Sequence, residues 1–404
     1  MSITIDDIRR AAATIREDLA STPAVGALRL SEQIGCELFL KLENLQHTGS
    51  FKERGALTKL RSLPGPAASA GVIAMSAGNH AQGVAYHATR LGIPATIVMP
   101  ANTPFTKIER TESYGATVLL HGESLSEAET FAHAMAAREG LTFVHPYDDP
   151  EVIAGQGTCG LEFLQAVPDL DLLVVPVGGG GLIAGMAIAA KALKPDIRII
   201  GVEAELYPSM QCVLAGRPVA CHGVTVAAGS AVKSPGHITR EIVARMVEEI
   251  VLVDETALER AIHDLAVEQK IVAEGAGAAG VAALLSNPER FRGLRVGTVI
   301  CGGNIDARVL ASILMRGLIR QQRMVRLRIG ISDSPGALAR VTRLIGETGG
   351  NIVEVYHQRL FHNVPVKMAE VDVVLETRNP AHVAQIMARL TEAGFPTEHM
   401  SDIS

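Results

Sequence analysis

The sequence predicts an α/β protein with parallel sheets, followed by a smaller domain that mixes helices with strands. Through most of the 404 residues, short runs rich in Val, Ile and Leu alternate with helix-length segments, as in a parallel sheet covered by helices. Hydrophobic residues make up 48% of the chain and charged residues 20%, which favours a packed core over disorder. After about Gly317 the pattern changes, and residues 324–404 form a separate series.

Each apolar run has the length of one strand, and the segment that follows most of them has the length of a helix. The first run, VIAM at 72–75, precedes a helix-like stretch from Ala81. Because open α/β sheets bind ligands at the carboxyl ends of their strands, we expect the functional loops there. The later runs are ATIVMP (95–100), ATVLLHG (116–122), LTFVHPY (141–147), DLLVVPV (171–177), IRIIGVE (197–203), EIVLVD (249–254) and GTVICGG (297–303).

The C-terminal series predicts a ferredoxin-like unit with the order βαββαβ. In chain order its segments are MVRLRIGI (strand), PGALARVTRLIGET (helix), NIVEVYHQRL (strand), VKMAEVDVVLET (strand), PAHVAQIMARLTEAG (helix) and a final strand.

Composition excludes several classes of protein. A formal charge of −6 provides no electrostatic surface for nucleic acid or an anionic membrane. Residues 172–190 are uncharged, but Pro176 and four consecutive glycines indicate strand, turn and helix rather than a membrane span. Five scattered cysteines without a CxxC pair argue against disulfides and structural zinc, and the N-terminus does not resemble a signal peptide. We therefore expect a cytoplasmic protein.

Two glycine-containing loops follow predicted strands and could bind an anion. SAGNHAQG (76–83) leads into a helix whose positive end faces the loop, although an ordinary strand-to-helix turn has the same pattern. VGGGGLIAG (177–185) offers bare backbone amides for a phosphate, with tight packing of helix on sheet as the alternative. Since the second loop fits neither GxGxxG nor GxxxxGK[ST], a phosphate monoester is favoured over a dinucleotide or triphosphate.

Two further motifs add reactive side chains. In HTGSFKERGA (47–56), Lys52 taken alone reads as a solvated charge on the exposed face of a helix. In CGGN (301–304), Cys301 is either a small buried residue or a weak hydrogen-bond partner for a ring nitrogen. A pyridoxal phosphate site requires a Schiff-base lysine, a phosphate cradle and a partner for the pyridine nitrogen, and the motifs together supply all three.

In this order and spacing, SFKERGA, SAGNHAQG, GGGGL and CGGN resemble the threonine dehydratase (threonine ammonia-lyase) family of pyridoxal-phosphate enzymes. The tail from about residue 325 resembles an ACT domain, as in the single-ACT members of that family. The resemblance implies a two-lobed catalytic domain at 1–320 of the tryptophan synthase β-like type (fold type II). Its smaller lobe, roughly 50–155, is inserted in the larger one, and a ferredoxin-like regulatory domain occupies 325–404.

The resemblance also implies roles for individual residues. Lys52 holds the cofactor and removes the substrate Cα proton, while Phe51 packs against the ring. Asn79 donates to the ring's 3-oxygen, and Cys301 faces the pyridine nitrogen and leaves it unprotonated. The phosphate is wrapped by Gly178, Gly179, Gly180, Gly181 and Leu182, and the substrate carboxylate is bound by Ser76, Ala77, Gly78, Asn79 and His80.

The implied reaction is deamination of L-threonine to 2-oxobutanoate and ammonia, with L-serine as an additional substrate. The alternatives within the superfamily are a serine or hydroxyaspartate dehydratase and a racemase. Racemases similar to this fold carry a serine where this chain has Ala77, and alanine cannot deliver a proton. Two further hypotheses come from other classes of protein. The intact Lys52 disfavours an amino-acid sensor with a degenerate site. The missing GxGxxG loop disfavours a nicotinamide-dependent oxidoreductase.

Two departures from the family pattern concern polar residues. Ala228 replaces the usual acid in the segment before Gly229. The segment GVEAELYPS aligns with a cation site of racemase-type relatives through Glu203, the Tyr207 carbonyl and Ser209, but a serine replaces an aspartate there. Because divalent cations prefer charged oxygen ligands, we predict no metal.

For the tail, the resemblance implies regulation by an amino acid, with isoleucine or valine as the natural effector, and assembly into a homodimer or homotetramer. The alternative is that the tail only helps assembly. The effector-contact positions are Asp333, Ser334, Pro335, Gly336 and Asn351.

Overall fold

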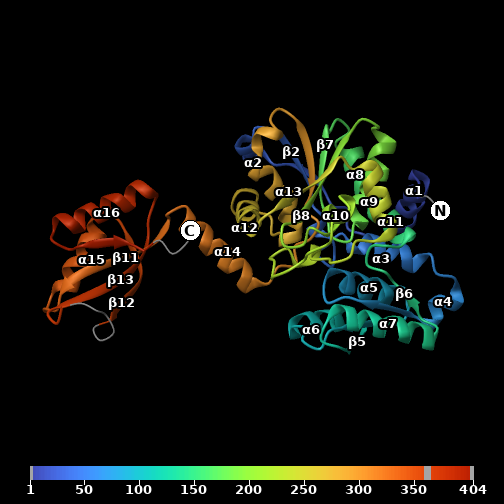
Figure 1. Cartoon of the computed structure of the whole chain (residues 1–404), viewed down its shortest axis with the longest axis horizontal. Helices are drawn as coiled ribbons and strands as arrows, with labels where there is room; N and C mark the ends of the chain where they lie inside the picture. Colours follow the sequence, from blue (N-terminus) through green and yellow to red (C-terminus); the bar gives the residue numbers. More distant parts are fainter. Residues whose placement is uncertain (1–2, 359–364, 401–404) are drawn as a thin grey trace. The chain divides into compact units, whose positions relative to one another are not determined.

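The computed structural model describes residues 3–358 and 365–400. The chain forms two compact units, Met1–Ile305 and Asp306–Ser404, both shown in Figure 1. Helix α14 (Ala307–Arg320) falls in the second unit, and the catalytic-domain boundary expected at residue 320 stays a prediction. Within the described ranges, no helix has the length and apolar character required to cross a membrane.

The larger lobe of the first unit is built on a six-stranded sheet with the strand order β1-β2-β10-β7-β8-β9. Every neighbouring pair is parallel except β1 with β2. The central β7 is buried at all five positions, which explains why its sequence is continuously apolar. The strands are β1 (Ala24–Gly26), β2 (Glu37–Lys41), β7 (Leu172–Pro176), β8 (Arg198–Ala204), β9 (Glu249–Val253) and β10 (Arg295–Val299).

The helices of this lobe cover the sheet, and loops connect them to the ends of its strands (Figure 1). They are α1 (Ile5–Ile15), α2 (Leu28–Ile34), α8 (Pro150–Ala166), α9 (Gly181–Leu193), α10 (Ser209–Leu214), α11 (His237–Met246), α12 (Glu255–Asp264) and α13 (Gly275–Ser286), with the short turns η1 (Glu43–Leu45), η2 (Ala228–Ser230), η3 (Leu265–Gln269) and η4 (Pro288–Arg290).

The smaller lobe carries a four-stranded parallel sheet with the order β5-β4-β3-β6. Successive residues of β3 pack into different cores, Val72 and Ala74 into one and Ile73 into the other, so both faces are covered. The strands are β3 (Val72–Met75), β4 (Ala95–Met99), β5 (Thr117–Leu120) and β6 (Thr142–Phe143); the helices are α3 (Lys52–Arg61), α4 (Gly65–Ala70), α5 (Asn79–Arg90), α6 (Phe105–Ser113) and α7 (Leu125–Glu139).

The second unit is an antiparallel sheet, ordered β12-β13-β11-β14, with two helices. Alternate residues of β11 are buried in its core, as the period of two in a strand requires. The elements follow the predicted βαββαβ order: β11 (Met324–Ser332), α15 (Ala337–Glu347), β12 (Asn351–Gln358), β13 (Met368–Glu376), α16 (Pro380–Glu392) and β14 (Thr397–His399). Residues 359 and 360, predicted to extend the second strand, lie outside the described ranges.

The predicted fold class is confirmed, namely an α/β unit with two sheets and an antiparallel four-stranded unit. The prediction omitted β1 and β2, and β1 makes the larger sheet mixed. β1 has only three residues and no buried position, so it lacks the apolar run that identifies a strand in a sequence.

Backbone contacts join the loop before Lys52 to the loop after β10. The Phe51 amide donates to the Cys301 carbonyl at 3.0 Å, and the Gly303 amide donates to the Gly49 carbonyl at 2.9 Å. An isolated β-bridge pairs the residues between them. The lysine motif and the CGGN motif therefore share one edge of the larger sheet, as expected for loops at strand ends.

Candidate active site

Lys52 is the first residue of α3, and its ammonium donates to the Pro146 carbonyl at 2.7 Å. Its Nζ lies 5.3 Å from the centre of the Phe51 ring. Burial lowers the pKa of Lys52 to about 8, although the Glu274 carboxylate acts in the opposite direction. A lysine with a depressed pKa keeps a useful fraction of its amine neutral, which is the nucleophilic form.

The two charged residues after Lys52 are both fully buried, which makes the exposed-face reading of this run wrong. Glu53 and Arg54 are each 0% exposed. Arg54 binds the equally buried Glu43 through two hydrogen bonds of 2.7 and 2.8 Å, and Glu162 through two of 2.7 Å. The helix that carries Lys52 is thus fixed by a buried ion pair in its first turn.

Glu53 ties the same helix to the preceding loop. Its carboxylate accepts the Thr48 amide and contacts His87 Nε2 of α5 at 3.1 Å. Glu53, which the sequence analysis did not single out, therefore joins the first turn of α3 to the preceding loop and to α5.

The tetraglycine loop turns directly into α9, and its residues lack side chains because neighbours occupy that space. Gly180 has φ +94°, a conformation that favours glycine. A Cβ on Gly179 would overlap the ring of Tyr147, whose hydroxyl donates to the Ser234 carbonyl at 2.8 Å. Tight packing, the alternative reading of these glycines, is thus observed at Gly179. Among the described residues, no side chain caps the start of α9, so its first amides suit an anion.

Asp148, which the sequence analysis did not single out, ties the segment containing Tyr147 to α11. Its carboxylate accepts the backbone amides of His237, Ile238 and Thr239 at 2.9, 2.8 and 3.2 Å. Thr239 in turn donates its hydroxyl to the Gly179 carbonyl at 2.7 Å. The phosphate-loop candidate is therefore braced from two sides by groups distant in sequence.

The SAGNH loop lies at the end of β3, and its last two residues belong to α5 rather than to the loop. Asn79 is the first residue of the helix, and the Gly78 amide donates to Ser76 Oγ at 3.2 Å. His80 is buried, and its Nε2 contacts the Val144 carbonyl at 2.9 Å. Burial, together with the charge of Lys52, lowers the pKa of His80 to about 3, so this imidazole is neutral at physiological pH.

Cys301 follows β10 and is 4% exposed. Burial raises the pKa of its thiol well above the ordinary value, so the group is a neutral thiol rather than a thiolate. Pyridoxal phosphate fits the residues present, because a lysine of lowered pKa, an uncapped glycine-rich helix start and a neutral thiol surround one edge of the sheet.

Two residues that were not among the predicted site residues contact the predicted site residue Asn79. Glu274 accepts Asn79 Nδ2 at 2.6 Å, and Asn304 donates to Asn79 Oδ1 at 2.8 Å. Asn304 was within reach of the sequence analysis as the last letter of CGGN. Glu274 stands before a run of glycines and alanines and offers no comparable pattern.

The departures from the family pattern have simple local explanations. Ala228 is exposed, so the acid missing there leaves no buried partner unpaired. The Glu203 carboxylate accepts the amides of Met210 and Gln211 at 2.8 and 2.9 Å and the Ser209 hydroxyl at 3.3 Å, and Tyr207 donates its hydroxyl to the Gly223 carbonyl at 3.0 Å. In the described part of the chain, no group of three His, Cys, Asp or Glu side chains could hold a metal.

The effector-contact positions lie at two ends of the second unit's sheet. Asp333, Ser334, Pro335 and Gly336 follow the end of β11, whose Ser332 pairs with Met368. Asn351 pairs with Glu376, which also pairs with Met324 at the start of β11. Eight residues of strand correspond to about 27 Å, so one chain does not bring the two groups together.

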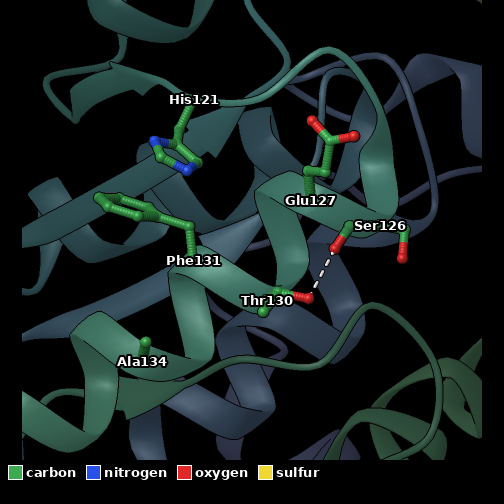
Figure 2. A pocket seen from close by; sticks show the side chains of 6 residues that line it. All are labelled: His121, Ser126, Glu127, Thr130, Phe131 and Ala134. Carbon is green, nitrogen blue, oxygen red and sulfur yellow. Dashed lines mark hydrogen bonds between the residues drawn. The ribbon is translucent and has the colours of Figure 1, made fainter.

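A hollow of about 350 Å³ on α7 is separate from all of these residues. Figure 2 shows the His121 ring stacked on Phe131, with 3.9 Å between ring centres. None of the predicted site residues contributes to it. Its lining consists of His121, Ser126, Glu127, Thr130, Phe131 and Ala134.

Comparison with known proteins identifies relatives of both units. The family model "Pyridoxal-phosphate dependent enzyme" matches residues 15–302, and "ACT domain" matches residues 320–393. Among solved structures, the chain is similar to maize serine racemase (TM-score 0.73, 33% identity, covering 80% of this chain and 100% of that chain). It is also similar to the processed form of threonine deaminase isoform 2 from Solanum lycopersicum (TM-score 0.73, 35% identity, covering 77% of this chain and 87% of that chain).

The fold and the site therefore define a pyridoxal-phosphate-dependent enzyme of fold type II with an added ACT domain, as the sequence motifs predicted. Over 395 residues the chain is 44% identical to the L-threonine ammonia-lyase of Thermotoga maritima, covering 97% of this chain and 98% of that protein. The chain belongs to the L-threonine ammonia-lyase family.

Proposed function

We propose that this protein deaminates L-threonine to 2-oxobutanoate and ammonia, and also L-serine to pyruvate. The observation that carries the proposal is Lys52, an amine with a lowered pKa beside the Cys301 loop and the Asn79 helix. Family membership along nearly the whole chain supports the substrate.

Bound pyridoxal phosphate would supply an electron sink for the pair of electrons left when the substrate loses its Cα proton. Lys52 would hold the cofactor and then, once displaced by the substrate amine, take that proton at Nζ as general base. The first amides of α9, from Gly181 and Leu182, would bind the phosphate, together with the amides of the preceding glycines. The neutral Cys301 thiol would leave the ring nitrogen without a proton, which suits elimination over longer-lived carbanion chemistry.

The same residues would orient the amino acid. Ser76 to His80 would bind its carboxylate at the start of α5, where the helix end favours an anion. Because His80 is neutral, it contributes no positive charge to this carboxylate. Ala77 provides no proton donor, which is why we favour elimination over racemisation despite the similarity to a serine racemase structure.

For the tail, we propose that an amino acid, isoleucine or valine, binds the ACT unit and regulates turnover. The match of an ACT model to residues 320–393 supports this assignment. Since the two groups of effector-contact positions are separated within one chain, we propose that two chains complete each effector site. The resulting assembly would be a homodimer or homotetramer.

Release of 2-oxobutanoate from L-threonine by the purified protein, with and without isoleucine, tests the proposal. Lys52→Ala is the control, and we expect it to abolish release. Turnover that isoleucine does not change would leave the proposed chemistry intact and reject isoleucine as the effector. Cofactor-loaded protein that releases no 2-oxo acid from threonine or serine would reject the function.

A further inference from the structure

Asn79 lies in the middle of a chain of side-chain hydrogen bonds that fixes the direction of its amide. Asn304 donates from Nδ2 to the Thr48 carbonyl at 2.7 Å and to Asn79 Oδ1 at 2.8 Å. Asn79 then donates from Nδ2 to Glu274 Oε1 at 2.6 Å. All four residues come from different elements or loops of the first unit.

The direction of this chain follows from its two ends. The Thr48 carbonyl can only accept, so the Asn304 atom facing it must be the amide nitrogen. The same Asn304 nitrogen also faces the Asn79 amide. Because this nitrogen can only donate, the Asn79 atom that faces it must be the acceptor, Oδ1. At the other end, an ionised Glu274 only accepts, so it too requires the nitrogen of Asn79.

Backbone packing holds each end in place. The Thr48 amide donates to the buried Glu53, and the Glu274 amide donates to the Gly302 carbonyl at 3.0 Å. A Cβ on Gly49 would lie 2.7 Å from Asn304 Oδ1, so Asn304 fills the space beside this glycine. These contacts leave little room for the Asn304 amide to rotate.

We propose that Asn304 and Glu274 are positioning residues that present the second N–H of Asn79, rather than its oxygen, to the cofactor. This inference rests on the proposed function, in which Asn79 faces the 3-oxygen of pyridoxal phosphate. A donor at this position stabilises the anionic form of that oxygen, and an acceptor would instead favour the protonated oxygen. The two neighbours of Asn79 therefore set the protonation state of the ring oxygen without touching it.

Glu274 lies among other ionisable groups. The ionisable groups that influence it or are influenced by it are Lys52 on α3, Lys107 on α6 and the Cys301 thiol after β10. Burial raises the pKa of the Glu274 carboxyl, while the hydrogen bond from Asn79 and the two lysines oppose that rise. Ala228 stands in place of the family's usual acid, and Glu274 places a carboxylate beside the next residue, Gly229. A Cβ added to Gly229 would lie 3.2 Å from Glu274 Oε1.

The test is the absorption spectrum of the lysine-bound cofactor in variants of both neighbours, measured together with the cofactor Kd. Asn304→Asp replaces the donor that faces Asn79 Oδ1 by an acceptor, which favours the rotated Asn79 amide that turns its oxygen towards the cofactor. We expect the ratio of the long-wavelength to the short-wavelength band to fall about tenfold, the effect of one hydrogen bond to a charged group. Glu274→Gln keeps an acceptor for Asn79, so its band ratio should stay close to that of the unaltered protein.

Asn44→Asp is the matched control, because Asn44 also donates to a carbonyl, that of Val272 at 3.1 Å, and lies against the same loop. An unchanged band ratio in Asn304→Asp, or an equal fall in Asn44→Asp, would overturn the inference. If Asn304→Asp does not fold, Glu274→Leu, which cannot accept, carries the test, and a ratio equal to that of Glu274→Gln would overturn it. Failure of the unaltered protein to form a visible band or to release 2-oxobutanoate would instead reject the proposed function.

Discussion

Replacing Arg54 by methionine should destabilise the first unit by about 3 to 5 kcal/mol, because the fully buried Glu43 carboxylate loses two hydrogen bonds and its nearest cation, and keeps Lys41 at 3.5 Å as its cationic neighbour. Although burial alone would raise the pKa of Glu43, the charges of Arg54 and Lys41 hold it at about 2, against an ordinary 4.5. This difference corresponds to about 3 kcal/mol in favour of the ionised form. For a unit of this size, a loss of about 4 kcal/mol lowers the melting temperature by roughly 6 °C.

The assay is thermal unfolding followed by circular dichroism, with Glu162→Gln as the control. The Glu162 side chain is 43% exposed, so water can replace its contact with Arg54, and the control should cost about 1 kcal/mol or less. The stabilisation from Glu43 is fully present above pH 4.5 and is lost as the pH falls towards 2. The difference between Arg54→Met and the unaltered protein should therefore narrow below about pH 4.5. Equal melting temperatures for the two variants at pH 7, or a difference that widens in acid, would refute the reasoning.

Three other predictions concern the site. Gly179→Ala places a methyl group against the Tyr147 ring, so we expect about tenfold weaker cofactor binding by fluorescence titration, and an unchanged Kd would contradict this packing. Since the pKa of Lys52 is about 8, the rate at which apoprotein captures pyridoxal phosphate should rise with pH and level off above pH 8. A rate that still increases up to pH 10 would show that Lys52 has the pKa of a solvated lysine. Asp148→Ala removes the acceptor for three backbone amides of α11, and it should lower the free energy of unfolding in urea by about 1 to 2 kcal/mol. Asp148→Asn keeps an acceptor oxygen and should retain most of this stability. Equal losses in the two variants would argue against a capping role for Asp148.

The sequence predicted the parts of the fold in which local pattern and burial agree. In the second unit, alternation in β11 identifies both the strand and its buried face. The tetraglycine run identifies a turn that approaches a ligand or a neighbour, because only bare backbone fits there. Strand β1 was missed because three residues without a buried position produce no pattern.

The site was predicted less completely, for a physical reason. Glu53 and Arg54 have the composition of a solvated helix face, and only partners distant in sequence, such as Glu43, show that they are buried. Glu274 likewise becomes recognisable only through its contact with Asn79. The environment of a charged residue depends on partners that are distant in sequence, and a local motif contains no information about those partners.

The bridge between Ser50 and Gly302 has a consequence for how the protein is made. These residues are about 250 positions apart, which a ribosome takes roughly 13 to 50 s to synthesise. Until then Lys52 lacks the neighbouring CGGN loop, whose backbone pairs with the loop before α3. We therefore expect a complete site for pyridoxal phosphate only in chains that have been synthesised through that loop.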